Sequence, residues 1–297
     1  MSSDHRRPLY CFVLGTGRCG STLVHEVLAR HPDVGFVSNL EDHLPWLRIM
    51  GRCNNALYRR IPPGLSRKGR LRYAPSEGYR ALEHQVSPAL STPLRDLTAD
   101  DATPWLVQRV RTFFESRAHV QATPVFLHKF TGWPRARFLQ QALPGARFVH
   151  VVRDGRAVAN SWLQMPWWRG YQGPAQWQFG PLPASYEAEW ESSDYSFVIL
   201  AGLAWKLLMD AFVAAEQDVG AESWMNIRYE DIVVDPRQRF GELLQFLEME
   251  WTPTFESAFV RYHFDPVRTQ AFRTDLDASS LRLLEVSLAS HLESYGY

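Results

Sequence analysis

Short apolar runs alternate with amphipathic stretches along most of the chain. Buried strands are predicted where nearly every residue of a short run is apolar or aromatic, at 9–14, 34–37, 125–129, 148–152 and 224–229. Helices are predicted where apolar positions recur every three or four residues, at 23–29, 78–90, 103–119, 135–143, 155–161, 196–216, 236–247 and 279–294. Strands that alternate with helices predict an α/β fold. With no repeat and no linker-like segment, one domain over 1–297 is expected.

A glycine-rich loop at 15–22 joins the first predicted strand to the first predicted helix. Its sequence is Gly-Thr-Gly-Arg-Cys-Gly-Ser-Thr. Glycines allow positive φ and a close backbone approach, and the free amides at a helix start bind phosphate-like anions. Arg18, Ser21 and Thr22 add a positive charge and two hydroxyl groups. The loop could be only a tight turn, but these side chains favour an anion site.

This glycine loop comes close to the nucleotide-binding pattern G-x-x-x-x-G-K-[ST]. Gly15 and Gly20 have the required spacing, but Ser21 stands where the pattern has its lysine. Arg18 could supply a charge with a different geometry. The loop therefore predicts a phosphate site tuned to something other than ATP hydrolysis. An ATP-dependent kinase and a non-catalytic nucleotide-binding protein stay open as alternatives.

Ionisable side chains follow the second and third predicted strands. Glu41, Asp42 and His43 lie just after the second strand, and Lys129 ends the third. Ligands of open α/β sheets bind in the crevice at the carboxyl ends of the strands. These residues are therefore candidates for chemistry, although acidic capping of a helix start and a solvated lysine would explain them equally well.

The fourth predicted strand ends at Arg153, and a helix follows. Ser161 lies about two turns inside that helix. An arginine at a strand end and a hydroxyl group on the next helix can grip one phosphate together. A surface pair of Arg153 with Asp154 and a serine packed inside a helix is the alternative interpretation.

Residues 162–197 are rich in aromatic side chains interleaved with Pro and Gly, without a clean period. A long irregular segment inside a compact domain is usually functional, and this much aromatic surface argues against disorder. We expect an acceptor-binding insertion or lid in which Trp167 and Trp168 stack on the acceptor. The alternative is a loop that completes the core. The basic, turn-rich stretch within 51–77 predicts a solvated surface loop.

Composition narrows the function classes. The net charge is zero with 22% charged and 45% hydrophobic residues, as in an ordinary soluble protein, so nothing draws the chain to nucleic acid. Cys11, Cys19 and Cys53 have no metal-like spacing, so neither a zinc site nor a disulfide framework is expected. We find no signal peptide and no apolar run long enough to span a bilayer, and we expect a cytoplasmic protein. The sequence carries no signal for oligomeric state.

Three segments together resemble the PAPS-dependent sulfotransferase family, in its bacterial and Golgi-like branch. They are the loop at 15–23, the strand-helix unit at 148–161 and Ile-Arg-Tyr-Glu-Asp-Ile-Val-Val-Asp-Pro at 227–236. The resemblance implies a three-layer α/β sandwich with a mainly parallel sheet, like that of P-loop NTPases. It also implies sulfuryl transfer from 3′-phosphoadenosine 5′-phosphosulfate (PAPS), with PAP as product and without a metal ion, to a hydroxyl or amine of an acceptor.

The resemblance also implies donor-site roles. The 5′-phosphosulfate would lie on the glycine loop, at Gly17, Arg18, Cys19, Gly20, Ser21 and Thr22. Arg153 and Ser161 would hold the 3′-phosphate, and Tyr229 would lie near the adenine. Cys19 replaces the small hydroxyl residue that the family usually has.

Catalytic roles implied by the resemblance are charge stabilisation by Arg18 and Lys129 and proton removal by a base. Glu41 is the first candidate base, before His43 and Asp42. In the tyrosyl-protein branch the base stands slightly earlier, at the position of Asn39 here. Small-molecule, glycan, lipid and peptide acceptors all suit an aromatic-lined cleft.

Overall fold

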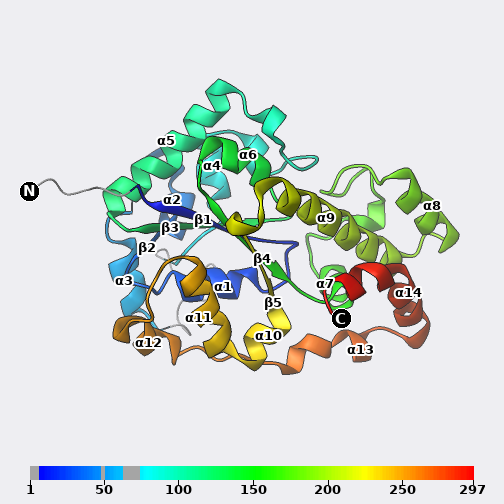
Figure 1. Cartoon of the computed structure of the whole chain (residues 1–297). Coiled ribbons are helices and arrows are strands. Elements are labelled where there is room, and N and C mark those ends of the chain that lie inside the picture. Colours follow the sequence, from blue (N-terminus) through cyan, green and yellow to red (C-terminus); the bar gives the residue numbers. More distant parts are fainter. Residues whose placement is uncertain (1–6, 48–50, 63–73) are drawn as a thin grey trace, which may run out of the picture.

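A five-stranded sheet runs through the centre of the computed structural model, in the order β2-β3-β1-β4-β5 (Figure 1). The strands are β1 (Leu9–Gly15), β2 (Val34–Phe36), β3 (Val125–Thr131), β4 (Arg147–Val152) and β5 (Trp224–Arg228). All neighbouring pairs are parallel. The structure describes residues 7–47, 51–62 and 74–297. All five predicted strands are confirmed, with ends that differ by at most two residues.

Strand β1 shows why helices cover both faces of the sheet. Tyr10, Phe12 and Leu14 belong to one buried cluster, and Cys11 and Val13 belong to another. Successive side chains of a strand point to opposite faces, so two separate layers must bury them. Figure 1 shows α5, α6 and α9 on one side of the sheet and α1 and α11 on the other. The predicted three-layer α/β sandwich is therefore confirmed.

Helices account for most of the remaining described residues. They are α1 (Ser21–Leu28), α2 (Asn39–His43), α3 (Asn54–Arg60), α4 (Tyr79–Gln85), α5 (Pro104–Gln121), α6 (Ala136–Ala142), α7 (Gly155–Leu163), α8 (Ala184–Ser192), α9 (Phe197–Val219), α10 (Tyr229–Val234), α11 (Pro236–Phe246), α12 (Pro253–Phe259), α13 (Phe272–Asp275) and α14 (Ala278–Ser294). The side chains of Thr103 and Asp235 cap α5 and α11, since they accept from the amides of Leu106 and Gln238.

The predicted helix at 78–90 is shorter than expected. Helix α4 ends at Gln85, and a separate 3₁₀ turn covers Pro88–Leu90, because Pro88 lacks the amide that would continue the helix. The predicted loop at 51–77 contains the helix α3, which ends with Arg59 and Arg60. The other basic residues of that stretch, Arg67, Lys68, Arg70 and Arg72, lie outside the described residues.

Helix α9 corrects the expectation that no apolar run is long enough to cross a bilayer. Among the described residues it alone has the length and composition required, but 61% of its apolar window is buried inside the protein. Gly202 lies so close to α14 that a Cβ there would be 2.5 Å from Leu284 Cδ1. The apolar composition of α9 is therefore used in packing against neighbouring helices.

The aromatic stretch at 162–197 contributes largely to the core. Trp162 stacks on Trp168 with ring centroids 6.0 Å apart, and on Phe179 at 5.2 Å. Trp168 is only 6% exposed, so the prediction that it stacks on an acceptor is wrong and the core-packing alternative holds for it. Trp167 is 41% exposed and stays available.

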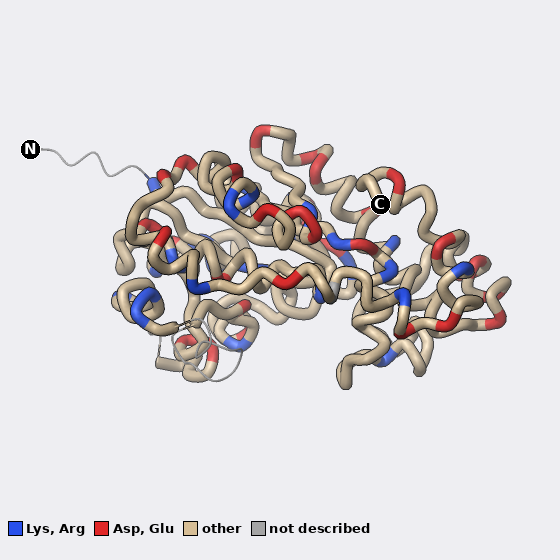
Figure 2. Tube along the Cα trace, turned by 90° about the horizontal axis from the view of Figure 1, so that it is seen from below, with Lys and Arg blue, Asp and Glu red and all other residues tan. Residues whose placement is uncertain are grey.

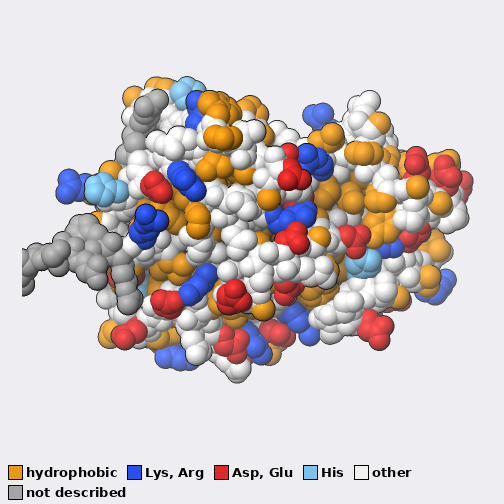
Figure 3. Space-filling view, turned by 45° about the horizontal axis from the view of Figure 1, so that its top comes forward, with side chains coloured by type: hydrophobic (Ala, Val, Ile, Leu, Met, Phe, Trp, Pro, Cys, Tyr) orange, Lys and Arg blue, Asp and Glu red, His pale blue; other side chains and the backbone are white. Residues whose placement is uncertain are grey.

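Charge is spread evenly over the fold. Figure 2 shows acidic and basic residues interspersed along the trace, and Figure 3 shows both signs scattered between apolar side chains on one face. The described residues therefore present both signs of charge side by side on the face that Figure 3 shows.

Candidate active site

The glycine loop connects β1 to α1 through three residues with positive φ. These are Gly17 at 85°, Arg18 at 57° and Gly20 at 93°. A Cβ on Gly20 would lie 2.2 Å from Tyr229 Cδ2. Glycine is therefore required at position 20, both by the backbone conformation and by the tyrosine ring packed against it. This contact places Tyr229, from the start of α10, against the loop.

Cys19 differs from its neighbours in the loop. Its side chain is fully buried in the cluster beneath the sheet, together with Val24 and Val151. The thiol therefore belongs to this apolar cluster and is closed off from a donor on the loop. Only its backbone can contribute to an anion site.

Arg18, Arg153 and Ser161 meet at one side of the loop. Arg18 donates from Nε to Ser161 Oγ at 2.9 Å, and Arg153 donates from Nη1 to the Arg18 carbonyl oxygen at 2.8 Å. The Arg153 guanidinium also lies 4.9 Å from the centroid of the Tyr229 ring. The structure thus brings together the residues predicted from the Arg153-to-Ser161 spacing.

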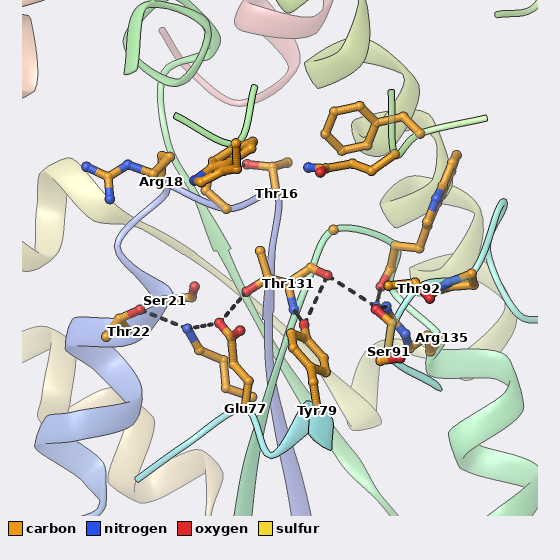
Figure 4. A pocket seen from close by; sticks show the side chains of 18 of the residues that line it. Thr16, Arg18, Ser21, Thr22, Glu77, Tyr79, Ser91, Thr92, Thr131 and Arg135 are labelled. Atoms are coloured by element: carbon orange, nitrogen blue, oxygen red, sulfur yellow. Dashed lines mark hydrogen bonds and ion pairs between the residues drawn. The ribbon is translucent and has the colours of Figure 1, made fainter. Parts of the chain in front are cut away.

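Lys129 lies at the carboxyl end of β3, beneath the glycine loop. Its Nζ is 2.5 Å from Glu77 Oε1 and donates to Thr22 Oγ1 at 2.8 Å. Thr131 Oγ1 donates to the same Glu77 oxygen at 2.8 Å. Dashed lines in Figure 4 follow these contacts from Thr22 on α1 through the lysine and Glu77 to Thr131. The lysine side chain is only 5% exposed, and a buried ammonium group needs partners of this kind.

Glu77 is a site residue that the sequence analysis missed. It belongs to a segment that pairs with the end of β2, where Ser38 and Pro75 form an antiparallel bridge and Ser76 N donates to Val37 O at 2.8 Å. This pairing carries Glu77 to the carboxyl edge of the sheet. The one local signal is a carboxylate just before Gly78, the N-cap of α4.

Glu41, the first candidate base, lies elsewhere. It is 1% exposed, and its Oε1 accepts from Arg117 Nε at 3.0 Å. Its Oε2 accepts from Ser38 N at 2.8 Å and from Asn54 Nδ2 at 2.7 Å. The carboxylate therefore caps α2 and neutralises a buried arginine, and it has no path to an acceptor. The structure corrects its assignment as the base.

Asp42 and His43, the two other candidate bases, also contact groups away from the cavity. Asp42 Oδ1 accepts from the amides of Arg80 and Ala81 at 2.8 and 3.3 Å, so it caps α4. His43 is exposed, and its Nδ1 lies 2.7 Å from the Asn39 carbonyl oxygen. Neither residue lines the cavity described next.

A cavity of about 740 Å³ opens beside the glycine loop. Its walls come from the loop, from Glu77 and Tyr79, and from residues 91–94, 129, 131–133, 135, 153, 167, 177–179 and 229. Among its described lining residues, Arg18, Lys129, Arg135 and Arg153 are basic and Glu77 alone is acidic. The excess of cations favours an anionic ligand. The described part of the chain contains no cluster of three or more His, Cys, Asp or Glu that could hold a metal ion.

The parallel sheet, glycine loop and cationic cavity define an α/β protein with a candidate site for an anionic group. A model of the sulfotransferase family matches residues 11–253. The chain belongs to the sulfotransferase family and is a sulfuryl-transferring enzyme. The resemblance found in the sequence is thus confirmed.

Solved structures share the fold. Sulfotransferase STF1 from Mycobacterium tuberculosis H37Rv is similar with a TM-score of 0.58 and 14% identity, over 97% of this chain and 78% of that one. Sulfotransferase STF9 from Mycobacterium avium is similar with a TM-score of 0.52 and 15% identity, over 99% of this chain and 78% of that one. A search of curated proteins gives no significant match.

Proposed function

We propose that this sulfotransferase uses PAPS as its donor and moves the sulfuryl group to a hydroxyl or amine group of an acceptor in the cavity. The observation that carries the proposal is the position of Lys129. Its ammonium group is held between Thr22 of the loop helix and Glu77, so a cation and an acidic group lie beside the predicted anion site. This is the combination that group transfer requires, because charge must be stabilised and a proton must be removed.

The residues around the loop fit such a donor. PAPS, when bound, supplies the sulfuryl group and a phosphate leaving group. Gly17, Ser21 and Thr22 would contact the phosphosulfate at the start of α1, together with the backbone of Cys19 and Gly20. Arg153 and Ser161 would hold the 3′-phosphate, and the Tyr229 ring would lie along the nucleoside. The cationic lining of the cavity supports this proposal.

Lys129 and Arg18 would stabilise negative charge that develops during transfer. Glu77 takes the role first given to Glu41, because it is the one acidic group among the described lining residues. In this proposal Glu77 accepts the proton from the acceptor oxygen or nitrogen as that atom forms its bond to sulfur. Thr131 orients the carboxylate through its 2.8 Å hydrogen bond.

Thermal unfolding tests the donor against the kinase alternative. PAP at about 100 times its dissociation constant should stabilise the folded enzyme by about 2.7 kcal/mol and raise Tm by several degrees. ATP with Mg²⁺ should have little effect, since Ser21 replaces the lysine of the kinase loop. Stabilisation by ATP with Mg²⁺ and not by PAP would show that the donor is misassigned.

We also propose a compartment, a domain organisation and an acceptor class for the enzyme. We place it in the cytoplasm as a single domain over 1–297, acting on a small-molecule, glycan or lipid acceptor and not on nucleic acid. Cys11, Cys19 and Cys53 are free thiols, as is usual in a reducing compartment. The zero net charge supports the exclusion of nucleic acid.

A further inference from the structure

The cavity has two halves of different chemistry. One half lies beside the glycine loop, and the other lies on the far side of Glu77 from that loop. Trp133, Trp177 and Phe179 contribute to the walls of this second half and are 8%, 8% and 3% exposed. Trp167 and Leu94 also line the cavity but are 41% and 69% exposed. Aromatic and aliphatic walls of this kind recognise a ligand by apolar contact.

Several polar groups in this half already have partners in the protein, whereas Trp133 Nε1 has no hydrogen-bond partner. The Tyr79 hydroxyl accepts from the Thr131 amide at 3.0 Å, and burial raises the pKa of Tyr79, so the ring stays neutral. Trp177 Nε1 donates to the Gly180 carbonyl oxygen. Ser91 Oγ donates to Glu83 Oε1 at 2.6 Å. These groups therefore fix the wall and offer little to a ligand with many hydroxyl groups.

Arg135 lines this half, and both terminal nitrogens of its guanidinium donate to backbone oxygens, whereas its Nε has no hydrogen-bond partner. Its guanidinium donates to the carbonyl oxygens of Thr131, Trp133 and Ser91, and the residue is 1% exposed. Figure 4 shows it beside Ser91 at the edge of the cavity. The side chain holds residues 91 and 131–133 together, so we assign it to positioning the wall and not to binding an anion.

The wall is built before any ligand arrives. Trp168 packs edge-on against Trp177 at 6.2 Å, and Trp177 packs against Phe179 at 5.3 Å. A Cβ on Gly180, where φ is 73°, would lie 2.4 Å from the Leu94 carbonyl oxygen. The segments 177–180 and 91–94 therefore touch and limit the cavity on the side away from the loop.

From these contacts we infer that the acceptor is a neutral, flat, mainly apolar ring compound with a hydroxyl group, and not a saccharide or an anionic acceptor. The inference rests on the proposed function and deepens it. The hydroxyl group lies at Glu77 and Lys129. The ring lies among the Trp133, Trp177 and Phe179 side chains, with the exposed Trp167 against it. Gln178 and Thr92, both exposed at the cavity, leave room for one further neutral polar group.

A matched acceptor panel tests this inference with the full chain and PAPS. We expect kcat/KM for 2-naphthol to exceed that for 6-hydroxy-2-naphthoate and for maltotriose by at least tenfold. A preference for the naphthoate would overturn the neutral acceptor, and a preference for maltotriose would overturn the apolar one. PAP binding is measured separately by calorimetry. Failure of PAP to bind contradicts the proposed donor, whereas PAP binding without turnover of 2-naphthol contradicts this inference alone.

Two tryptophan variants separate acceptor binding from folding. Trp167→Ala should raise KM for 2-naphthol about tenfold while PAP affinity and Tm stay near those of the parent enzyme. Trp105→Ala is the matched control, because Trp105 is 60% exposed and does not line the cavity. Equal KM values for the two variants would overturn the placement of the ring against Trp167.

Discussion

Arg18 reaches from the glycine loop to helix α7 and donates from Nε to Ser161 Oγ at 2.9 Å. The two residues are 143 positions apart in the sequence, yet they close one side of the proposed donor site. Arg153 strengthens the junction by donating to the Arg18 carbonyl oxygen. The loop and the proposed 3′-phosphate grip are therefore one connected unit, and changes in either should alter donor affinity.

Arg153→Ala should weaken PAP binding by at least about tenfold, because hydrogen bonds to charged groups contribute roughly 1.5–3 kcal/mol each. Binding of adenosine 5′-phosphosulfate, which lacks the 3′-phosphate, should barely change. Calorimetry with both ligands measures the difference. Arg156→Ala is the matched control, since Arg156 pairs with Asp154 at 2.8 Å and Glu285 at 3.1 Å and does not line the cavity. Equal losses for both ligands in Arg153→Ala would contradict the 3′-phosphate role.

Gly20→Ala should reduce donor affinity more than tenfold. The new Cβ meets the Tyr229 ring at 2.2 Å, and the positive φ of 93° strains any other residue there. Gly241→Ala is the control, because its Cβ would meet nothing within 4 Å. In helix α11 that change should stabilise the protein by about 0.5–1 kcal/mol without altering PAP affinity. Unchanged PAP binding in Gly20→Ala would show that Tyr229 is not part of the donor site.

Glu77→Gln and Glu41→Gln should differ in their effect on catalysis. Glu77→Gln should lower kcat by about 10²–10⁴-fold with PAP still bound, as expected when a general base is lost. Glu41→Gln leaves the buried Arg117 charge uncompensated and should lower the free energy of unfolding by about 3–5 kcal/mol. Its kcat should stay within a few-fold of the parent value at a temperature where it is folded.

Steady-state kinetics, PAP calorimetry and urea unfolding of both variants test whether Glu77 acts in catalysis and Glu41 in stability. His43→Asn serves as an additional control and should keep the parent kcat, because His43 does not line the cavity. Near-parent kcat in Glu77→Gln would remove Glu77 from the role of base. A large kcat loss in His43→Asn, with donor binding intact, would restore the earlier candidate.

The sheet and the positions of Lys129, Arg153 and Ser161 could be predicted from the sequence because their signals are local. Residues 125–129 are apolar up to a cation, and the strand that they predict carries Lys129 to the sheet edge. The spacing from Arg153 to Ser161 lies within one strand-helix unit. Each of these residues is positioned by the element to which it belongs, so a short window of sequence contains the information.

The positions of the proposed base and of the proposed acceptor wall depend on contacts between distant segments. Glu41 follows a strand end as a catalytic residue should, but Arg117, 76 positions later, takes its carboxylate. Glu77 reaches the cavity through a bridge between Ser38 and Pro75. Trp167 and Trp168 are adjacent in the sequence, yet one is exposed and the other buried. Composition and periodicity hold no information about such pairings.

His128 offers a test of how burial sets the pH dependence of stability. It lies on β3 among Phe12, Phe114 and Phe130, with ring centroids 6.4, 5.2 and 4.7 Å away. Neither of its nitrogens has a hydrogen-bond partner. Burial is the largest cause that lowers the pKa of His128 from 6.5 to about 3, with the charges of Arg117 and Lys129 acting in the same direction and that of Glu77 opposing them.

The folded protein therefore binds this proton far less readily than the unfolded chain. The stability that neutral His128 contributes is fully present above pH 6.5 and is lost progressively as the pH falls towards about 3. His128→Leu keeps a similar volume and removes the titrating group and two unsatisfied nitrogens. At pH 7.5 the free energy of unfolding of the variant should lie within about 1.5 kcal/mol of that of the parent enzyme. When the pH falls from 7.5 to 5, the free energy of unfolding of the variant should decrease by about 2 kcal/mol less than that of the parent enzyme. Each pKa unit corresponds to about 1.4 kcal/mol.

Urea unfolding at both pH values measures the two changes in free energy. His150→Leu is a contrasting variant, because His150 Nδ1 lies 2.9 Å from Asn226 Oδ1 and the ring stacks on Phe212 at 3.9 Å. That change should destabilise the protein at pH 7.5 as well, since it removes one hydrogen bond of Asn226, whose Oδ1 also accepts from Trp224 Nε1, and the stacking on Phe212. Identical pH dependence in the parent enzyme and His128→Leu would mean that His128 does not titrate between these pH values on unfolding.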